Sequence, residues 1–145
     1  MAMTKQVKVT AKLVDKFRVE CQIDKHKLII DQPVQMGGTD MGPTPLQYMH
    51  ASLAGCLAAT ARITAMQKKI DIKNLEVTVD GELDLEVIMG KSQSVRAGFN
   101  GLTLSVKLDA ELTAEQKAEF LKEVERRCPV SDNIANVTPV TIRIV

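Results

Sequence analysis

Residues 44–69 read TPLQYMHASLAGCLAATARITAMQKK, and this stretch decides the fold. A threonine oxygen can accept an orphan N–H at a helix start, and proline suits the first helical position because it lacks an N–H. Thr44 and Pro45 therefore mark the start of a helix. From Leu46 to about Lys69 the chain has no further proline and is apolar or small almost all round. We expect a long central helix that is buried on most sides.

The length of this helix approaches that of a membrane span, which is about 20 residues. Polar side chains interrupt its surface, at Gln47, His50, Ser52 and Arg62, and residues 67–69 give it a polar end. These polar residues favour the central helix of a soluble protein, so we expect no membrane partner.

Alternating apolar and polar residues predict three strands before this helix. The pattern covers residues 7–14, 17–23 and 28–30, and residues 14–16 form a hairpin connection between the first two strands. Residues 32–44 then contain three glycines and two prolines. We expect them to form an irregular loop and the flexible rim of a pocket.

Two further stretches with the same alternation follow the helix. Residues 75–79 and 83–87 predict one long or bent strand, with Gly81 as a possible bulge between its halves. Residues 89–98 form a loop, and residues 102–109 predict another strand.

A second helix begins near Thr113, because Thr113 and Gln116 have the spacing of a capping box. Its apolar residues share one stripe and are expected to point inward. They are Phe120, Leu121, Val124 and Cys128. Pro129 should disturb this helix and leave residues 130–136 as a short helical or turned segment.

Residues 140–144 alternate once more and predict a final strand. Runs of strands separated by two helices are typical of an α+β domain. We therefore expect a single domain over residues 1–145, in which antiparallel sheets wrap around the long central helix.

The composition excludes several classes of protein. Nineteen Lys and Arg residues against 18 Asp and Glu residues give a formal charge of +1 over 145 residues, and only 3% of residues are aromatic. Such a chain offers neither the positive field nor the stacking surface that nucleic acid requires. The N-terminus shows no secretory signal, so we expect a cytoplasmic protein with no nucleic-acid partner.

The three cysteines are Cys21, Cys56 and Cys128, and no CxxC spacing occurs, which argues against a disulfide scaffold and a thiolate zinc site. Cys21 shares the apolar face of the second strand and is interpreted as structural. Cys128 sits at a helix break, where a side chain can move, and is either a core contact or a functional thiol.

Cys56 lies in the middle of the central helix and is either a small core residue or a reactive thiolate. Dipole effects fade within the first turn, so the helix start at Thr44 cannot activate it. A reactive Cys56 would need a cation to lower its pKa. Arg18 and Lys16 in the N-terminal hairpin are the available cations.

No cofactor or metal site is expected. His26 and His50 are the only histidines, and neither has a metal-ligand spacing to another histidine or to a cysteine. The glycine-rich stretch at residues 37–42 lacks the Lys-Ser/Thr ending of a phosphate-binding loop.

Three segments together resemble the OsmC/Ohr family of thiol-dependent peroxidases. They are Pro43-Thr44-Pro45, the helix that contains Ala54-Gly55-Cys56, and Cys128-Pro129-Val130-Ser131. The resemblance extends from about Lys8 to the end of the chain. It implies an OsmC-like fold that forms an intertwined homodimer with paired sites at the interface.

The resemblance also implies roles for the two cysteines. Cys56 would attack the O–O bond of an organic hydroperoxide and become a sulfenic acid, and Cys128 would resolve it as a disulfide. A thiol reductant of the dithiol or lipoyl type would reopen that disulfide. The substrate would enter along an apolar channel, and the residues expected to bind it are Gln47, Met49, Leu53 and Phe120.

One departure from the family pattern concerns the cation. Typical members carry a glutamate in the first turn of the helix, where it holds an arginine from the N-terminal hairpin against the thiolate. This chain has Leu46 and Gln47 there, and Gln47 supplies no negative charge, so it would hold Arg18 more weakly. A shift of two residues would put Lys16 in place of Arg18, without the bidentate geometry of a guanidinium.

Two functional hypotheses follow. In the first, the chain is a thiol peroxidase that uses Cys56, Cys128 and Arg18. In the second, motivated by Leu46 and Gln47, it is an OsmC-fold module that binds a small ligand or senses redox state and turns over little peroxide. A third interpretation, in which the thiols only pack, stays open at this point.

Overall fold

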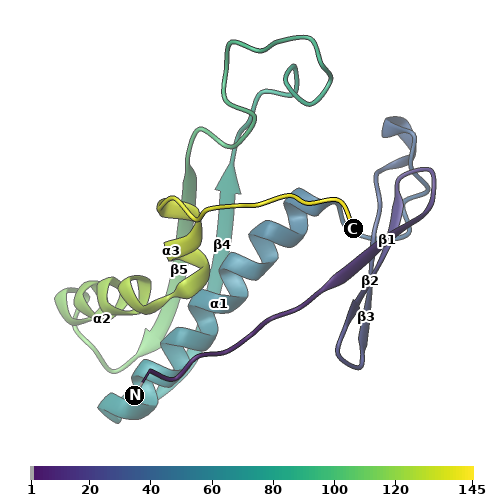
Figure 1. Cartoon of the computed structure of the whole chain (residues 1–145). Helices are drawn as coiled ribbons and strands as arrows, with labels where there is room; N and C mark the ends of the chain where they lie inside the picture. The colour runs from purple at the N-terminus through teal and green to yellow at the C-terminus, as the bar shows by residue number, and fades with distance from the viewer. Residues whose placement is uncertain (1) are drawn as a thin grey trace. The chain divides into compact units, whose positions relative to one another are not determined.

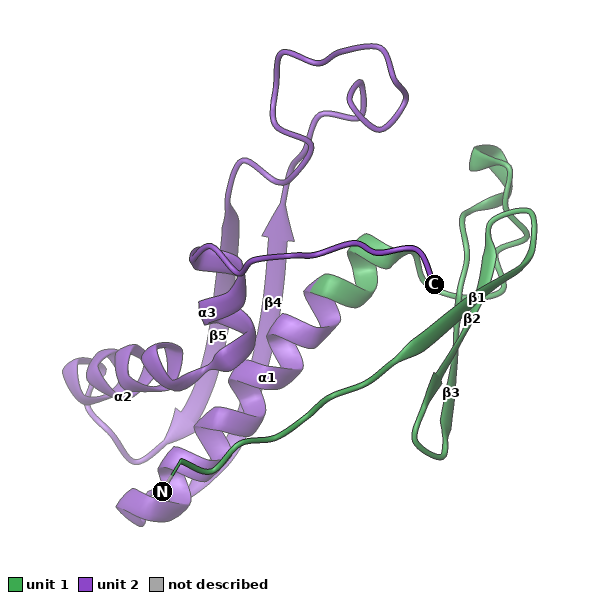
Figure 2. Cartoon of the chain, in the orientation of Figure 1, with its two compact units in different colours: residues 1–49 green, residues 50–145 purple. Residues whose placement is uncertain are grey.

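The alternating residues near the N-terminus form an antiparallel sheet in the order β1-β2-β3. Its strands are β1 (Thr10–Asp15), β2 (Arg18–Ile23) and β3 (His26–Ile30). The structure is a computed structural model that describes residues 2–145, and it divides into two compact units, with the boundary between residues 49 and 50 (Figure 1, Figure 2). The sheet of β1, β2 and β3 belongs to the first unit.

The short turns of this sheet use residues with positive φ. Lys16 between β1 and β2 has a φ of 43°, and Asp24 between β2 and β3 has a φ of 50°. Backbone of this kind matches the twist of the flanking strands. The three predicted strands are confirmed, but β1 begins at Thr10 rather than at residue 7, because its pairing with β2 starts at Thr10 and Gln22.

The loop after β3 is held by Asp31, whose side chain is buried. Its carboxylate accepts hydrogen bonds from the Thr39 hydroxyl at 2.6 Å and from the backbone N–H groups of Gln32, Thr39 and Met41. The Asp31 N–H donates to the carbonyl of Pro43 at 3.1 Å and closes the loop. The rim that the sequence predicts as flexible is therefore fixed by a network around one carboxylate.

This network also controls the titration of Asp31. The donated hydrogen bond of the Thr39 hydroxyl, followed by those of the backbone N–H groups, lowers the pKa of Asp31 to about 2. A carboxyl whose pKa is lowered on folding contributes stability above its unfolded pKa, and this contribution is lost as the pH falls toward the folded value.

We expect Asp31→Asn to lower the Tm at neutral pH, because an amide nitrogen would face N–H donors. The Tm difference between parent and variant should narrow between about pH 4 and about pH 2, where the parent carboxylate takes up its proton. Thermal unfolding of both proteins across that range measures this. A Tm difference that stays constant down to the lowest pH would contradict it.

The predicted central helix is α1 (Pro45–Lys68). Its start is a reciprocal cap, because the Gln47 N–H donates to the Thr44 hydroxyl at 3.3 Å and the Thr44 N–H donates to Gln47 Oε1 at 2.8 Å. One face of the helix is buried, at Leu53, Leu57, Thr60, Ala61, Thr64 and Ala65. Ile63 and Met66 are 51% and 70% exposed, so burial on most sides is wrong for the single chain.

The second unit contains an antiparallel pair, β4 (Ile72–Gly81) and β5 (Leu102–Ala110), followed by α2 (Ala114–Arg127) and α3 (Pro129–Ala135). The predicted capping box of Thr113 and Gln116 opens α2. The core combines α1, the hairpin and α2. Its buried members are Leu57, Ala61, Ala65, Ile72, Phe120, Val124 and Cys128.

The second half of one predicted strand and the whole of another are wrong, whereas residues 75–79 lie in β4 as predicted. Residues 83–87 leave the sheet, because β4 ends at Gly81 and the Asp84 carboxylate accepts the N–H of Glu86 in a local turn. A Cβ at Gly81 would also lie 2.5 Å from Leu102 Cδ2. Residues 140–144 form no strand, and no described strand pairs with them. The α+β class is confirmed, with one antiparallel sheet in each unit.

Candidate functional site

Cys56 lies in the middle of α1 and is half-buried. Its side chain packs against the core that α1 shares with β4, β5 and α2. The small residues around it in the sequence, Ala54, Gly55, Ala58 and Ala59, keep that part of the helix narrow. Cys56 is thus a core residue that retains some access to solvent.

Cys128 lies between α2 and α3 and is fully buried. It is both the C-cap residue of α2 and the N-cap residue of α3, and its N–H donates to the carbonyl of Glu125 at 3.1 Å. Pro129 begins α3 directly after it. The predicted helix break therefore places the thiol in the core, as the apolar stripe of α2 indicates.

The two thiols meet although they stand far apart in the sequence. Both are free cysteines, Cys56 packs against the core that contains Cys128, and it lies close enough to Cys128 to affect the pKa of that thiol. Burial is the main cause that raises the pKa of the Cys128 thiol, and the contact with Cys56 raises it further. The backbone N–H groups of Ser131 and Val130 act in the opposite direction. The net result is a thiol that holds its proton more firmly than a free cysteine.

The other predicted site residues lie as follows. Arg18 begins β2 opposite Asp15, and Gln47 and Met49 stand in the first turns of α1, so these residues belong to the first unit. The Gln47 side-chain oxygen is already occupied by the helix cap. Leu53 and Phe120 belong to the second unit and are both buried, Phe120 within the core that contains Cys128.

Sequence reasoning missed a polar cluster next to Cys128. Arg127 contacts Gln67 and Glu123, and Lys68 contacts Glu123, so the ends of α1 and α2 are joined. The spacing of Glu123 and Arg127 by four residues was the signal available in the sequence. It also missed Asp31, whose role depends on a loop that closes at Pro43, twelve residues later.

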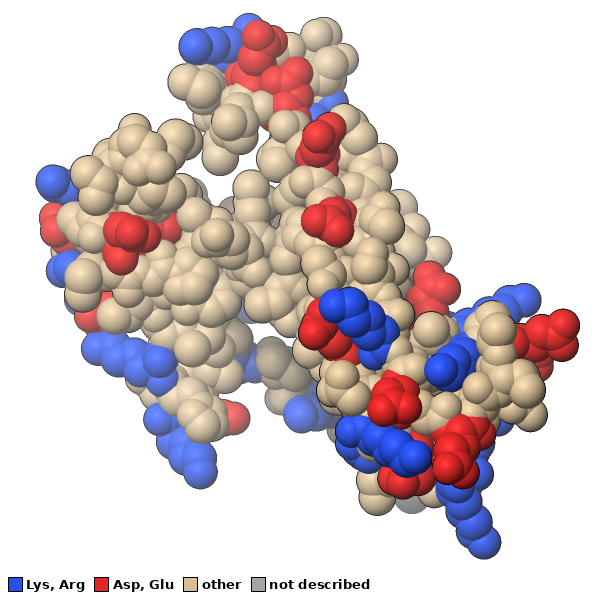
Figure 3. Space-filling model, turned by 180° about the vertical axis from the view of Figure 1, so that it is seen from behind, with Lys and Arg blue, Asp and Glu red and all other residues tan. Residues whose placement is uncertain are grey.

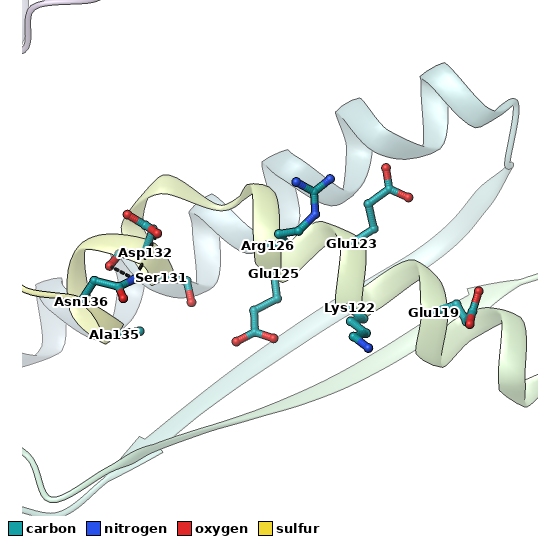
Figure 4. Close-up of a pocket in the computed structure, with 9 residues that line it drawn as sticks. All are labelled: Glu119, Lys122, Glu123, Glu125, Arg126, Ser131, Asp132, Ala135 and Asn136. Atoms are coloured by element: carbon teal, nitrogen blue, oxygen red, sulfur yellow. Dashed lines mark hydrogen bonds between the residues drawn. The ribbon is translucent and has the colours of Figure 1, made fainter.

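A recess of about 780 Å³ lies along α2 and α3 (Figure 4). Six of its nine lining residues are charged, among them Glu119, Lys122 and Arg126, and neither Cys56 nor Cys128 lines it. A charged recess does not suit an apolar substrate, so we assign the candidate site to the thiol pair rather than to this recess.

Charged side chains of both signs lie among each other on the face shown in Figure 3. Among the described residues, no group of three His, Cys, Asp or Glu side chains is placed to bind a metal ion. Within residues 2–145, no helix has both the length and the hydropathy of a bilayer crossing.

The fold and the thiol pair define an α+β protein with two facing cysteines in its core. The family model of the OsmC-like proteins matches residues 38–143. The chain therefore belongs to the OsmC-like protein family.

Several known proteins are similar to it. A curated relative, the hydroperoxide reductase of Mycoplasma pneumoniae, is 26% identical and is aligned over 98% of this chain and 96% of its own length. The crystal structure of an OsmC-like protein from Mycoplasma pneumoniae has a TM-score of 0.80 at 24% identity, covering 93% of this chain and 91% of that one. The organic hydroperoxide resistance protein OhrB of Bacillus subtilis has a TM-score of 0.61 at 24% identity, covering 88% and 89%. These structures confirm the OsmC-like fold.

The raised pKa of Cys128 predicts how stability depends on pH. Its contribution to stability is fully present below the thiol's unfolded pKa of about 8.5 and is lost as the pH rises through the higher folded value. The free energy of unfolding of the reduced parent should therefore fall more steeply above about pH 8.5 than that of Cys128→Ala. Urea unfolding under reducing conditions at a series of pH values measures this. Parallel pH profiles of parent and variant would contradict it.

Proposed function

We propose that this protein reduces organic hydroperoxides, with Cys56 as the attacking thiol and Cys128 as the resolving thiol. The observation that carries the proposal is the contact of the two side chains in the core, across the long chain segment that separates them. Membership of the OsmC-like family supports it, as does the printed name of the relative, a hydroperoxide reductase.

The first step is a displacement at oxygen. The Cys56 thiolate attacks the outer peroxide oxygen, the S–O bond forms as the O–O bond breaks, and the departing alkoxide takes up a proton to become the alcohol. The half-buried position of Cys56 suits this step, because the peroxide needs access to its sulfur. Arg18 is our choice for the cation that stabilises the thiolate, and Lys16 is the alternative.

The second step closes a disulfide. The sulfur of Cys128 attacks the sulfenic sulfur of Cys56, the S–S bond forms, and the sulfenic oxygen leaves as water. The raised pKa of Cys128 suits this order, because a protonated, fully buried thiol does not compete with Cys56 for peroxide. A thiol reductant of the dithiol or lipoyl type then returns both cysteines to the reduced state.

The proposal assigns substrate binding to Gln47, Met49, Leu53 and Phe120. Leu53 of α1 and Phe120 of α2 are buried apolar side chains, so the organic group of a hydroperoxide would contact them only where the core opens to admit it. Gln47 is committed through its side-chain oxygen to the cap of α1, so its free amide donor is the part left for a substrate oxygen. A cytoplasmic location belongs to the same proposal.

We expect Cys56→Ser to lower the rate of cumene hydroperoxide reduction by at least about 100-fold, because a hydroxyl replaces the nucleophile. Cys128→Ser should still consume about one equivalent of peroxide per chain and accumulate a sulfenic acid that dimedone traps. Cys21→Ala, which removes the remaining thiol, serves as the control and should retain the parent rate. A Cys56→Ser variant as fast as the parent would contradict the proposal.

The same assay separates the second candidate, a ligand-binding or redox-sensing module with little turnover. The neutral Gln47 at the helix start favours that candidate. Two results together would support it. Cys56 of the parent would form a sulfenic acid but turn over slowly, and Gln47→Glu would turn over much faster than the parent. A parent that is already fast would exclude it.

We also propose that the protein forms a homodimer. Residues 137–145 have no regular structure, and Val140 and Ile142 are 84% and 92% exposed. Ile63 and Met66 expose further apolar surface on α1. A second copy would cover both features, since an exposed strand-like segment pairs with the sheet edge of another chain.

We expect sedimentation equilibrium to show a dimer for the parent. Removal of residues 140–145 should weaken dimerisation by at least about tenfold, because the apolar segment that would pair with the second copy would be absent. A protein that sediments as a monomer at all concentrations would contradict the homodimer.

A further inference from the structure

We propose that Arg127 is a positioning residue for the resolving thiol. Together with Gln67, Lys68 and Glu123 it forms what we call the Arg127 cluster, which ties the end of α2 to α1 and keeps Cys128 beside Cys56. The inference rests on the proposed function for its purpose, while its physical content concerns only the equilibrium between the two thiols and their disulfide.

The Arg127 cluster joins the two helices by two routes. Arg127 Nη2 donates to Gln67 Oε1 at 2.9 Å, which links the last residue of α2 directly to α1. Lys68 Nζ lies 2.9 Å from Glu123 Oε2, which links the preceding turn of α2 to the end of α1. Arg127 Nη1 lies 3.5 Å from Glu123 Oε1 and connects the two routes.

Because Arg127 lies at the end of α2, its contacts act on the backbone position of the next residue, Cys128. Cys128 follows Arg127 directly and caps α2, and helix ends are the part of a helix that frays. Beyond Cys128 the chain turns into α3, which has only seven residues. Among the hydrogen bonds and ion pairs of residues 2–145, those of the Arg127 cluster are the attachment to α1 that lies nearest in sequence to the resolving thiol.

The chemical need for such an attachment follows from disulfide geometry. A disulfide forms only where the two Cα atoms lie about 4.4 to 6.8 Å apart, so the rate and equilibrium of closure depend on how often Cys128 occupies that range. Core packing orients the Cys128 side chain, and the Arg127 cluster limits movement of the backbone that carries it. Loss of the cluster lowers the effective concentration of one thiol at the other.

The size of the effect is set by exposure. The side chains of Arg127 and Glu123 are 28% and 31% exposed, and exposed ion pairs are individually weak. The cluster combines one hydrogen bond and two ion pairs that share Glu123 and Arg127, which makes it stronger than an isolated pair. We therefore expect a change of several-fold in the disulfide equilibrium, without loss of the fold.

The test measures the equilibrium of the Cys56–Cys128 disulfide against glutathione, with no peroxide present. Arg127→Gln should lower the equilibrium constant for closure about fivefold, which is a shift of about 20 mV to a less negative potential for a two-electron couple. Gln67→Ala should act in the same direction, and the double variant should lose little more, because both changes break one contact. Arg127→Lys should recover part of the loss, since it keeps the charge but not the planar donor pair.

Arg126→Gln is the matched control, because it removes the same charge from the neighbouring position without touching Gln67. Its potential should equal that of the parent. Three results would each overturn the inference. The first is an equal shift of potential in Arg126→Gln and Arg127→Gln, and the second is an unchanged potential in both Arg127→Gln and Gln67→Ala. The third is a parent that forms no disulfide. Thermal unfolding identifies variants that do not fold, and Gln67→Ala, at an exposed position, then carries the test.

Failure of the proposed function gives a different result. In one outcome, the Cys56–Cys128 disulfide of the parent forms in glutathione buffers while hydroperoxide fails to oxidise Cys56. In that case the proposed peroxidase function is wrong, and the role of Arg127 in placing Cys128 stands. If Cys56 is oxidised by hydroperoxide and both Arg127→Gln and Gln67→Ala leave the potential unchanged, the positioning role is wrong and the proposed function stands.

Discussion

The packing of α1 against the β4–β5 hairpin and α2 is the constraint on which the rest of the second unit depends. It buries one face of α1 and the apolar stripe of α2 in a common core. Because Cys56 stands at the margin of that face and Cys128 ends that stripe, the same packing that stabilises the unit brings the two sulfurs together. The thiol contact is thus a product of folding rather than an addition to it.

Unequal burial gives the two thiols different chemistry. Removal of water disfavours a thiolate, so the fully buried Cys128 keeps its proton, and the half-buried Cys56 retains contact with solvent. An accessible thiol beside a buried, protonated one suits the proposed mechanism, in which the accessible Cys56 attacks the peroxide and the buried Cys128 resolves the sulfenic acid. The order of roles in the proposed mechanism agrees with this difference in depth.

Local sequence signals predicted the elements that cap or pair within a few residues. The capping pairs at the starts of α1 and α2 and the alternation of β2 and β5 each contain the whole interaction in a short stretch. The strands predicted at residues 83–87 and 140–144 have the same alternation but no described partner strand. Alternation indicates which side chains share a face, and it cannot supply the neighbouring strand that a sheet needs.

The candidate site was predictable in part for a similar reason. Cys56 and Cys128 stand out because thiols are few and their surroundings match a known pattern, whereas the Arg127 contact depends on the crossing of two helices. The periodicity of apolar residues in the sequence does not indicate which exposed side-chain amide of α1 will contact the guanidinium at the end of α2. Cross-helix polar contacts of this kind require the packing to be known first.

The start of α1 shows how stability and chemistry compete for one side chain. Gln47 Oε1 satisfies the N–H of Thr44, and a glutamate at this position could make the same cap while keeping a second oxygen for a cation. With glutamine the cap is retained and the negative charge is lost. In the proposed mechanism, a cation that stabilises the Cys56 thiolate would therefore lack a carboxylate partner at this position of α1.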